Sequence, residues 1–217
     1  MKKSYIVILV LFLVLFIDQA SKIWVKTTME YGDQIPILGQ SWAFIHFVEN
    51  NGMAFGFSLG ENWGKLLLSL FRIFAVGFLI FYIIKLIKEK ASNFLLVCFS
   101  LILAGAIGNI IDSAFYGLIF SDTPYHGGLA TLFPKEGGYA GFLYGKVVDM
   151  LYFPLLEGAF PKWMPVWGGE HFLFFRPVFN IADASITTGV LLILVFQRRL
   201  FGTHKTSQET VLLNPPD

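Results

Sequence analysis

Charged residues, cysteine and histidine are all scarce in this sequence. Charged residues make up 14% and hydrophobic residues 55% of the 217 residues, which excludes an ordinary water-soluble domain. The lone Cys98 cannot form an intramolecular disulfide or a multi-cysteine metal site. The four histidines show no HExxH spacing, so no metalloprotease motif is present and we expect neither a metal nor a cofactor. A net charge of +1 gives no support for nucleic-acid binding.

Four long hydrophobic runs indicate the class of the protein. Each is close to the ~20 apolar residues that cross the hydrocarbon core of a bilayer. The runs cover residues 5–24, 65–86, 94–116 and 181–198. The sequence therefore predicts a polytopic α-helical membrane protein with four transmembrane helices. We expect one membrane-embedded domain over residues 1–201, followed by a polar tail over residues 202–217.

Basic residues near the ends of these runs predict the orientation. Lysines precede the first run and lie between the second and third, and arginines follow the fourth. Short basic connections stay in the cytoplasm, so both termini are expected there, with residues 25–64 and 117–178 outside. The first run also resembles a secretory signal peptide, but no small-residue cleavage site follows it, which favours a retained helix.

The two outer segments differ in composition from the spans. Residues 34–48 are rich in β-branched and aromatic residues, which predicts short strands in a small β-containing extracytoplasmic surface domain. Residues 117–178 are rich in glycine, proline and aromatic residues, a composition typical of a segment at the outer membrane surface.

Two carboxylates lie among apolar residues. Asp149 sits in Val147-Val148-Asp149-Met150, and Asp183 opens the fourth run. An ionisable residue in such a place is a functional-site hypothesis by default, because a charge in hydrocarbon costs a few kcal/mol. A helix rises ~22 Å from Arg198 to Asp183, which puts this carboxylate near the outer face of the membrane. We expect Asp149 and Asp183 to form a pair that shares a proton.

Other polar residues recur at helical spacing near the outer ends of the runs. Asn109 precedes Asp112 by three residues, and Asn180 precedes Asp183 by three, so each amide is expected beside its carboxylate on one helix face. Asn180 also fits a helix N-cap. Asp18 and Lys22 are four residues apart and are expected to neutralise each other.

Five short blocks carry a resemblance to a known family. In chain order they are Asp18-Gln19-Ala20-Ser21-Lys22, the block ENNGMAFG from Glu49, the block GAIGNIID ending at Asp112, Val147-Val148-Asp149, and Phe179-Asn180-Ile181-Ala182-Asp183. Together they resemble the ordered motifs of the bacterial lipoprotein signal peptidase, signal peptidase II.

The resemblance implies an intramembrane aspartic endopeptidase of the bacterial cytoplasmic (inner) membrane, with its active site toward the outer face. It implies cleavage of diacylglyceryl-modified prolipoproteins on the amino side of the lipidated cysteine, contact with membrane lipids, inhibition by globomycin-type cyclic peptides, and a monomer. The implied catalytic residues are Asp149 and Asp183. The implied substrate-binding or supporting residues are Asp18, Lys22, Asn50, Gly52, Asn109, Asp112 and Asn180.

The chain departs from the family pattern after Asp112. Ser113 stands where the family usually has arginine, so Asp112 is expected either to hydrogen-bond Ser113 or to pair with a basic residue elsewhere. Substitutes for the missing arginine are Arg72, Lys146 and Arg176. The long segments 117–146 and 152–178 are interpreted as an enlarged outer lid.

Three alternatives compete with this hypothesis. A small proton-coupled transporter or channel would use Asp18, Asp112 and Asp183 as a relay, although four spans without duplicated halves provide little pathway. Ser21 with Lys22 is a conceivable nucleophile and base. A non-enzymatic membrane scaffold would not need carboxylates in apolar surroundings.

Overall fold

The computed structural model of the protein describes residues 2–50, 63–174 and 177–201. Within these residues, four helical spans are long and apolar enough to cross a membrane: Lys3–Thr28, Gly64–Lys88, Asn93–Ile119 and Ile181–Leu200. The four predicted spans are confirmed, with somewhat wider bounds than the hydrophobic runs alone indicated. The predicted tail, residues 202–217, lies outside the described residues.

Short strands separate the long helices along the chain. In order, the elements are α1 (Lys3–Thr28), β1 (Gln34–Pro36), the 3-10 turn η1 (Ile37–Gly39), β2 (Phe44–Asn50), α2 (Trp63–Lys88), α3 (Asn93–Ile111), the π-helical turn η2 (Asp112–Tyr116), α4 (Gly117–Ile119), β3 (Val147–Tyr152), β4 (Leu156–Ala159), β5 (His171–Phe174), β6 (Val178–Phe179) and α5 (Ile181–Phe201).

The long helices expose large apolar side chains on their outer faces. Phe12 on α1, Phe74 on α2 and Val195 on α5 are 62%, 75% and 71% exposed. Side chains of this kind need an apolar solvent, and a helix satisfies its own backbone polar groups in hydrocarbon. These faces therefore suit contact with lipid.

Glycines let α3 approach its neighbours closely. A Cβ on Gly105 would lie 2.2 Å from the Ala182 carbonyl oxygen of α5, and a Cβ on Gly108 would lie 2.7 Å from an oxygen of Asp18 on α1. Small residues at helix contacts allow backbones to pack this tightly in membranes. The polar ends of α1, α3 and α5 are thus brought together.

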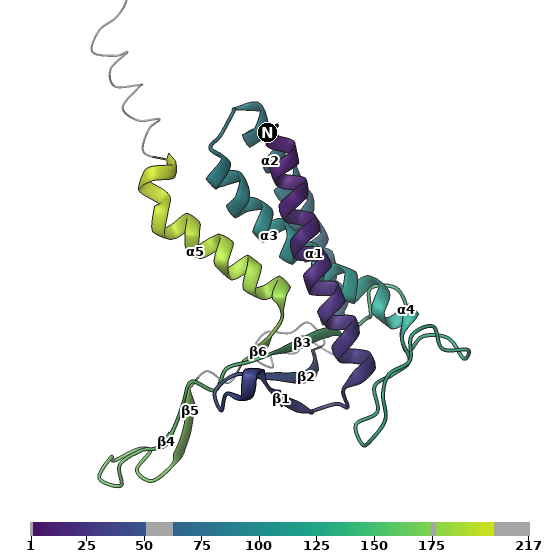
Figure 1. Ribbon diagram of the computed structural model, residues 1–217, viewed down its shortest axis with the longest axis vertical. Helices are drawn as coiled ribbons and strands as arrows, with labels where there is room; N and C mark the ends of the chain where they lie inside the picture. The colour runs from purple at the N-terminus through teal and green to yellow at the C-terminus, as the bar shows by residue number, and fades with distance from the viewer. Residues whose placement is uncertain (1, 51–62, 175–176, 202–217) are drawn as a thin grey trace, which may run out of the picture.

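A four-stranded antiparallel sheet lies at the end of the helices remote from the N-terminus (Figure 1). Its strand order is β1-β2-β3-β6, and the strands predicted from residues 34–48 are confirmed as β1 and β2. Strands β4 and β5 form a separate two-stranded ribbon. In Figure 1 this ribbon and the segment between α4 and β3 extend to opposite sides of the sheet.

Alternation along β3 determines where Asp149 points. Val148 and Met150 are buried in a cluster with Val25 of α1 and Phe47 of β2. Successive side chains of a strand point to opposite faces, so Asp149 lies on the other face. The sequence Val148-Asp149-Met150 thus buries two apolar residues on one side and presents one carboxylate on the other.

Candidate active site

Asp149 is a buried carboxylate with two amide partners. Its side chain is 4% exposed. Nδ2 of Asn180 donates a hydrogen bond to Asp149 Oδ1 at 2.7 Å, and Nδ2 of Asn50 donates to Oδ2 at 3.4 Å. Burial, followed by the nearby charge of Asp183, raises the pKa of Asp149 to about 7. This carboxyl group therefore exchanges its proton near neutral pH.

Asp183 lies in the first turn of α5 and is held from α3. Nδ2 of Asn109 donates to Asp183 Oδ1 at 2.8 Å. Asn109 and Asp112 both contact Lys22, in agreement with the expected shared helix face, and the Asn109 amide also reaches Asp183 across the α3–α5 contact. The close packing at Gly105 allows this additional contact, because it brings α5 within reach of the Asn109 side chain.

Asn180 connects the two carboxylates. Its side-chain oxygen accepts a hydrogen bond from Asp183 N at 2.9 Å, which is an N-cap contact. Its backbone N–H donates to Asp183 Oδ2 at 3.4 Å, while its side-chain amide donates to Asp149. Asn180 is fully buried. The N-cap and the site-supporting interpretations of Asn180 therefore both apply.

A second polar cluster lies directly beside this pair. Nζ of Lys22 is 2.9 Å from carboxylate oxygens of both Asp18 and Asp112, and all three side chains are completely buried. Gln19 donates to both carboxylates at 3.0 Å and accepts a hydrogen bond from the Tyr116 hydroxyl. The expected pairing of Asp18 with Lys22 is confirmed, and Asp112 completes it.

The Lys22 cluster also contacts the elements that carry the Asp149–Asp183 pair. Asp18 accepts a hydrogen bond from Ala182 N at 2.9 Å, at the N-terminus of α5. Asp112 accepts from Val148 N at 3.2 Å, next to Asp149. Nζ of Lys22 lies 3.1 Å from Asn109 Oδ1. Asp18, Lys22 and Asp112 thus support the backbone on both sides of the pair.

The departure at Ser113 now has a structural account. Asp112 pairs with Lys22, while Ser113 donates to the Asn109 carbonyl oxygen at 3.0 Å. A hydrogen bond of 3.4 Å runs from Nη1 of Arg72, on α2, to Ser113 Oγ. Of the two candidate substitutes in the described part of the chain, Arg72 reaches this position, while Lys146 pairs with Glu49 and Asp122. The third candidate, Arg176, lies outside the described residues.

A third buried cluster fastens the segment after α4 to the sheet. Lys26 of α1 contacts Glu49 of β2 and Thr123. Glu49 also lies 3.2 Å from Nζ of Lys146, which is 2.8 Å from Asp122. Through Glu49, this cluster holds the end of β2, where Asn50 lies. These contacts were not predicted from the sequence, in which the position of Lys26 just after the first hydrophobic run is the only signal of them.

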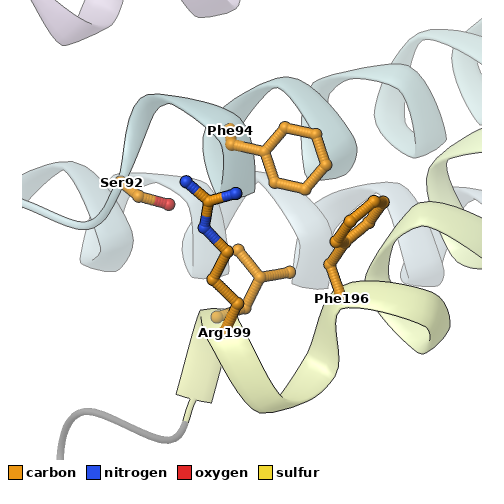
Figure 2. A pocket seen from close by; sticks show the side chains of 5 residues that line it. Ser92, Phe94, Phe196 and Arg199 are labelled. Atoms are coloured by element: carbon orange, nitrogen blue, oxygen red, sulfur yellow. The ribbon is translucent and has the colours of Figure 1, made fainter.

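Gly52, the remaining residue expected in the site, falls outside the described residues. In the part of the chain that is described, no group of three or more His, Cys, Asp or Glu side chains is placed to hold a metal ion. A cavity of about 300 Å³, lined by Ser92, Phe94, Phe196, Arg199 and Leu200, lies at the opposite end of α3 and α5 from the aspartates (Figure 2).

The arrangement suits acid–base chemistry. A buried carboxyl that titrates near neutrality, coupled to a second carboxylate, can keep one proton between two groups. Such a pair can supply a general base and a general acid at the same site. The helical spans and this pair together define a membrane protein with a candidate hydrolytic site.

The comparisons with known proteins identify the family. A family sequence model described as "Signal peptidase (SPase) II" matches residues 10–198. The chain therefore belongs to the signal peptidase II family and is a multi-pass membrane peptidase.

Relatives support this assignment over most of their length. The chain is 56% identical over 189 residues to a lipoprotein signal peptidase of Porphyromonas gingivalis, covering 84% of this chain and 78% of the relative. It is 42% identical to one from Amoebophilus asiaticus, covering 86% and 75% of the two chains, and 30% identical to one from Staphylococcus carnosus, covering 95% and 99%.

Solved structures agree with the fold. A bacterial membrane enzyme solved by the in meso method at 2.3 Å matches with a TM-score of 0.55 at 23% identity, covering 97% of this chain and 93% of that one. Another, solved at 1.9 Å, matches with a TM-score of 0.53 at 26% identity, covering 87% and 90%. The predicted polytopic helical fold and the predicted family are both confirmed, and no observation favours the transporter.

Proposed function

We propose that this peptidase is an aspartic endopeptidase in which Asp149 and Asp183 form the catalytic pair. The observation that carries the proposal is the bridging by the fully buried Asn180, whose side-chain amide donates to the Asp149 carboxylate and whose backbone N–H donates to the Asp183 carboxylate. Its hydrogen bonds keep the two groups in one site at the junction of β3 and α5. The roles proposed for Asp18, Lys22, Asn109 and Asp112 are to support that junction.

The reaction needs one water and one shared proton. The ionised carboxylate takes a proton from the water while the water oxygen bonds to the peptide carbonyl carbon, and the protonated carboxyl donates to the carbonyl oxygen. When the tetrahedral diol collapses, the carbon–nitrogen bond breaks. A proton then passes to the leaving amine and another returns from the diol. The pair is left with its single proton and no metal is required.

The proposed substrate is a diacylglyceryl-modified prolipoprotein cut on the amino side of the lipidated cysteine. The name of the relatives, lipoprotein signal peptidase, supports this substrate class. The site lies where the helices meet the sheet, so the scissile bond of a lipid-anchored peptide would lie at that level of the bilayer (Figure 1). Asn50, beside Asp149, and Gly52 are proposed to contact the peptide backbone.

The proposed orientation puts the sheet outside the bacterial inner membrane and both termini in the cytoplasm. Lys85 and Lys88 in the last turn of α2, and Arg198 and Arg199 in the last turn of α5, lie at the end remote from the sheet, which supports this orientation. We further propose one domain over residues 1–201 with a cytoplasmic tail, a monomeric enzyme in contact with lipids, and inhibition by globomycin-type cyclic peptides.

Cleavage of a defined substrate tests the function. The purified full-length protein in detergent is incubated with a diacylglyceryl prolipoprotein and with the same precursor lacking the lipid. We expect a faster-migrating product from the lipidated precursor alone, with the new N-terminus at the lipidated cysteine. Cleavage of both precursors alike, or at another bond, would contradict the substrate assignment.

A further inference from the structure

Arg72 is a cation inside a hydrophobic helix, with no role yet in the proposed reaction. It is the one charged residue of α2 between Lys65 and Lys85. From Gly64, where the span begins, the helix rises ~12 Å to Arg72, so the backbone of Arg72 lies well inside the span. A charge at this depth is costly and is a functional-site hypothesis by default. Its surroundings should therefore show what it does.

The side chain of Arg72 reaches η2, the turn that continues α3. Its guanidinium donates to Ser113 Oγ at 3.4 Å, and the Ser113 hydroxyl donates to the Asn109 carbonyl oxygen at 3.0 Å. The side chain of Asn109 in turn donates to Asp183 at 2.8 Å. One hydroxyl thus separates the guanidinium from the residue that holds Asp183.

Arg72 forms no ion pair with a carboxylate of the described residues. Among the described residues, the lysines that lie within ion-pair distance of a carboxylate are Lys22, Lys26, Lys85 and Lys146, and Arg72 is not paired in this way. It nevertheless interacts electrostatically with the carboxylates of Asp183, Asp112 and Asp149. Its positive charge therefore acts on both members of the Asp149–Asp183 pair as well as on Asp112.

The charge balance of the site explains why a second cation is useful. Four carboxylates face the site, from α1 (Asp18), η2 (Asp112), β3 (Asp149) and α5 (Asp183). The buried cation among them, Lys22, is shared between Asp18 and Asp112. Even with one proton on the Asp149–Asp183 pair, negative charge exceeds positive charge. In a medium of low dielectric constant, this excess disfavours the ionised carboxylate that must act as the base.

We propose that Arg72 is a positioning residue for the reaction, whose guanidinium, held by Ser113, stabilises the singly ionised form of the Asp149–Asp183 pair. This inference rests on the proposed function of that pair. In this role Arg72 makes no contact with the scissile bond. The guanidinium acts through its positive charge and through the hydrogen bonds that lead from Ser113 to Asn109.

The test is the pH profile of cleavage by Arg72→Met, Arg72→Lys and Ser113→Ala proteins. Without the cation, a higher pH is needed to ionise the base, so the acidic limb of the profile for Arg72→Met should move up by about one pH unit. Below the limb kcat should fall about tenfold, and the deficit should shrink as the pH rises. KM should change less than kcat. Arg72→Lys should keep the limb near its wild-type position, and Ser113→Ala should move it upward by less than Arg72→Met.

Lys85→Met is the matched control, because it removes a cation from the same helix at the end remote from the aspartates. Its profile should equal that of the wild type. A folded Arg72→Met protein with an unchanged limb and kcat, or with the same loss at every pH, would overturn the inference. If Asp149→Asn and Asp183→Asn are inactive in the same assay, the proposed function survives that result. If either of them is active, the proposed function itself fails.

Discussion

Asn180 shows how a single residue organises the site. Its side-chain oxygen caps the first turn of α5, and its side-chain nitrogen donates to Asp149. The same nitrogen also lies 3.2 Å from Asn109 Oδ1 and 3.3 Å from the Val148 carbonyl oxygen. An aspartate here would cap the helix but could not donate, and it would bring a further negative charge beside Asp149. The amide is therefore the side chain that serves both partners.

The raised pKa of Asp149 implies that the stability of the folded protein depends on pH. The folded protein holds this proton more tightly than the unfolded chain does, because burial and Asp183 raise the pKa from 3.8 to about 7. The stabilising effect is fully present below about pH 4 and is lost as the pH rises through about 7. The contribution of this proton to the free energy of unfolding is at most about 4 kcal/mol. Asp149→Asn, which stays neutral, should therefore melt at a higher temperature than the wild type at about pH 8, with a smaller difference at about pH 5.

Thermal unfolding in one detergent at both pH values measures this difference. Asp122→Asn is the control with the opposite sign. Partial burial acts to raise the pKa of Asp122, but its hydrogen bond and ion pair with Lys146 lower it overall. Its contribution is therefore present near neutral pH and lost as the pH falls. A gap between Asp149→Asn and wild type that is the same at both pH values would contradict the account of Asp149.

At the scale of elements, the packing of α3 sets the geometry of the site. Its glycines bring α1 and α5 close enough for Asn109 and Asp112 to reach side chains and backbone on other elements. At Asp112 the α-helix gives way to the π-helical turn η2. Turns of this kind are frequent at functional sites. Here the turn carries Asp112 and Ser113, which contact Lys22 and Arg72.

Gly105→Ala is expected to damage the enzyme. The added Cβ would lie 2.2 Å from the Ala182 carbonyl oxygen, so α5 must shift and carry Asp183 away from Asn109. We expect cleavage activity to fall at least about tenfold, since a misplacement of about 1 Å in an active site can cost more than this. We also expect a lower melting temperature.

Gly77→Ala is the matched control on α2, because nothing lies within 4 Å of its added Cβ. It should retain activity and melt at the same or a slightly higher temperature, since alanine favours a helix over glycine by about 1 kcal/mol. Equal behaviour of the two variants in cleavage and melting would show that close α3–α5 packing does not position the site.

For the whole molecule, the sequence predicted more of the architecture than of the contacts. The four spans, the strands near residue 40 and the pairing of Asp18 with Lys22 followed from hydrophobicity, composition and helical spacing. The partner of Asn109 did not, because spacing along one helix cannot show what a neighbouring helix brings close. The cluster of Lys26 and Glu49 was missed for the same reason, since its members come from separate elements.

Topology can be tested on the whole molecule by labelling introduced cysteines. In a Cys98→Ser background, His126→Cys and Lys162→Cys should react with a membrane-impermeant maleimide on spheroplasts. Glu89→Cys should react only after the membrane is permeabilised, because short basic connections stay in the cytoplasm. Labelling of Glu89→Cys on intact spheroplasts with protection of His126→Cys would invert the proposed orientation.

The most direct test of the central claim compares three aspartate substitutions in the prolipoprotein cleavage assay. Asp149→Asn and Asp183→Asn keep the shape of the side chain but cannot exchange the proton, so each should lose at least about 10²-fold in rate while remaining folded. Asp112→Asn should be less stable, because Lys22 loses one of its two carboxylate partners, but it should retain measurable turnover. An inactive but folded Asp112→Asn protein, found together with an active Asp149→Asn or Asp183→Asn protein, would contradict the assignment of the catalytic pair.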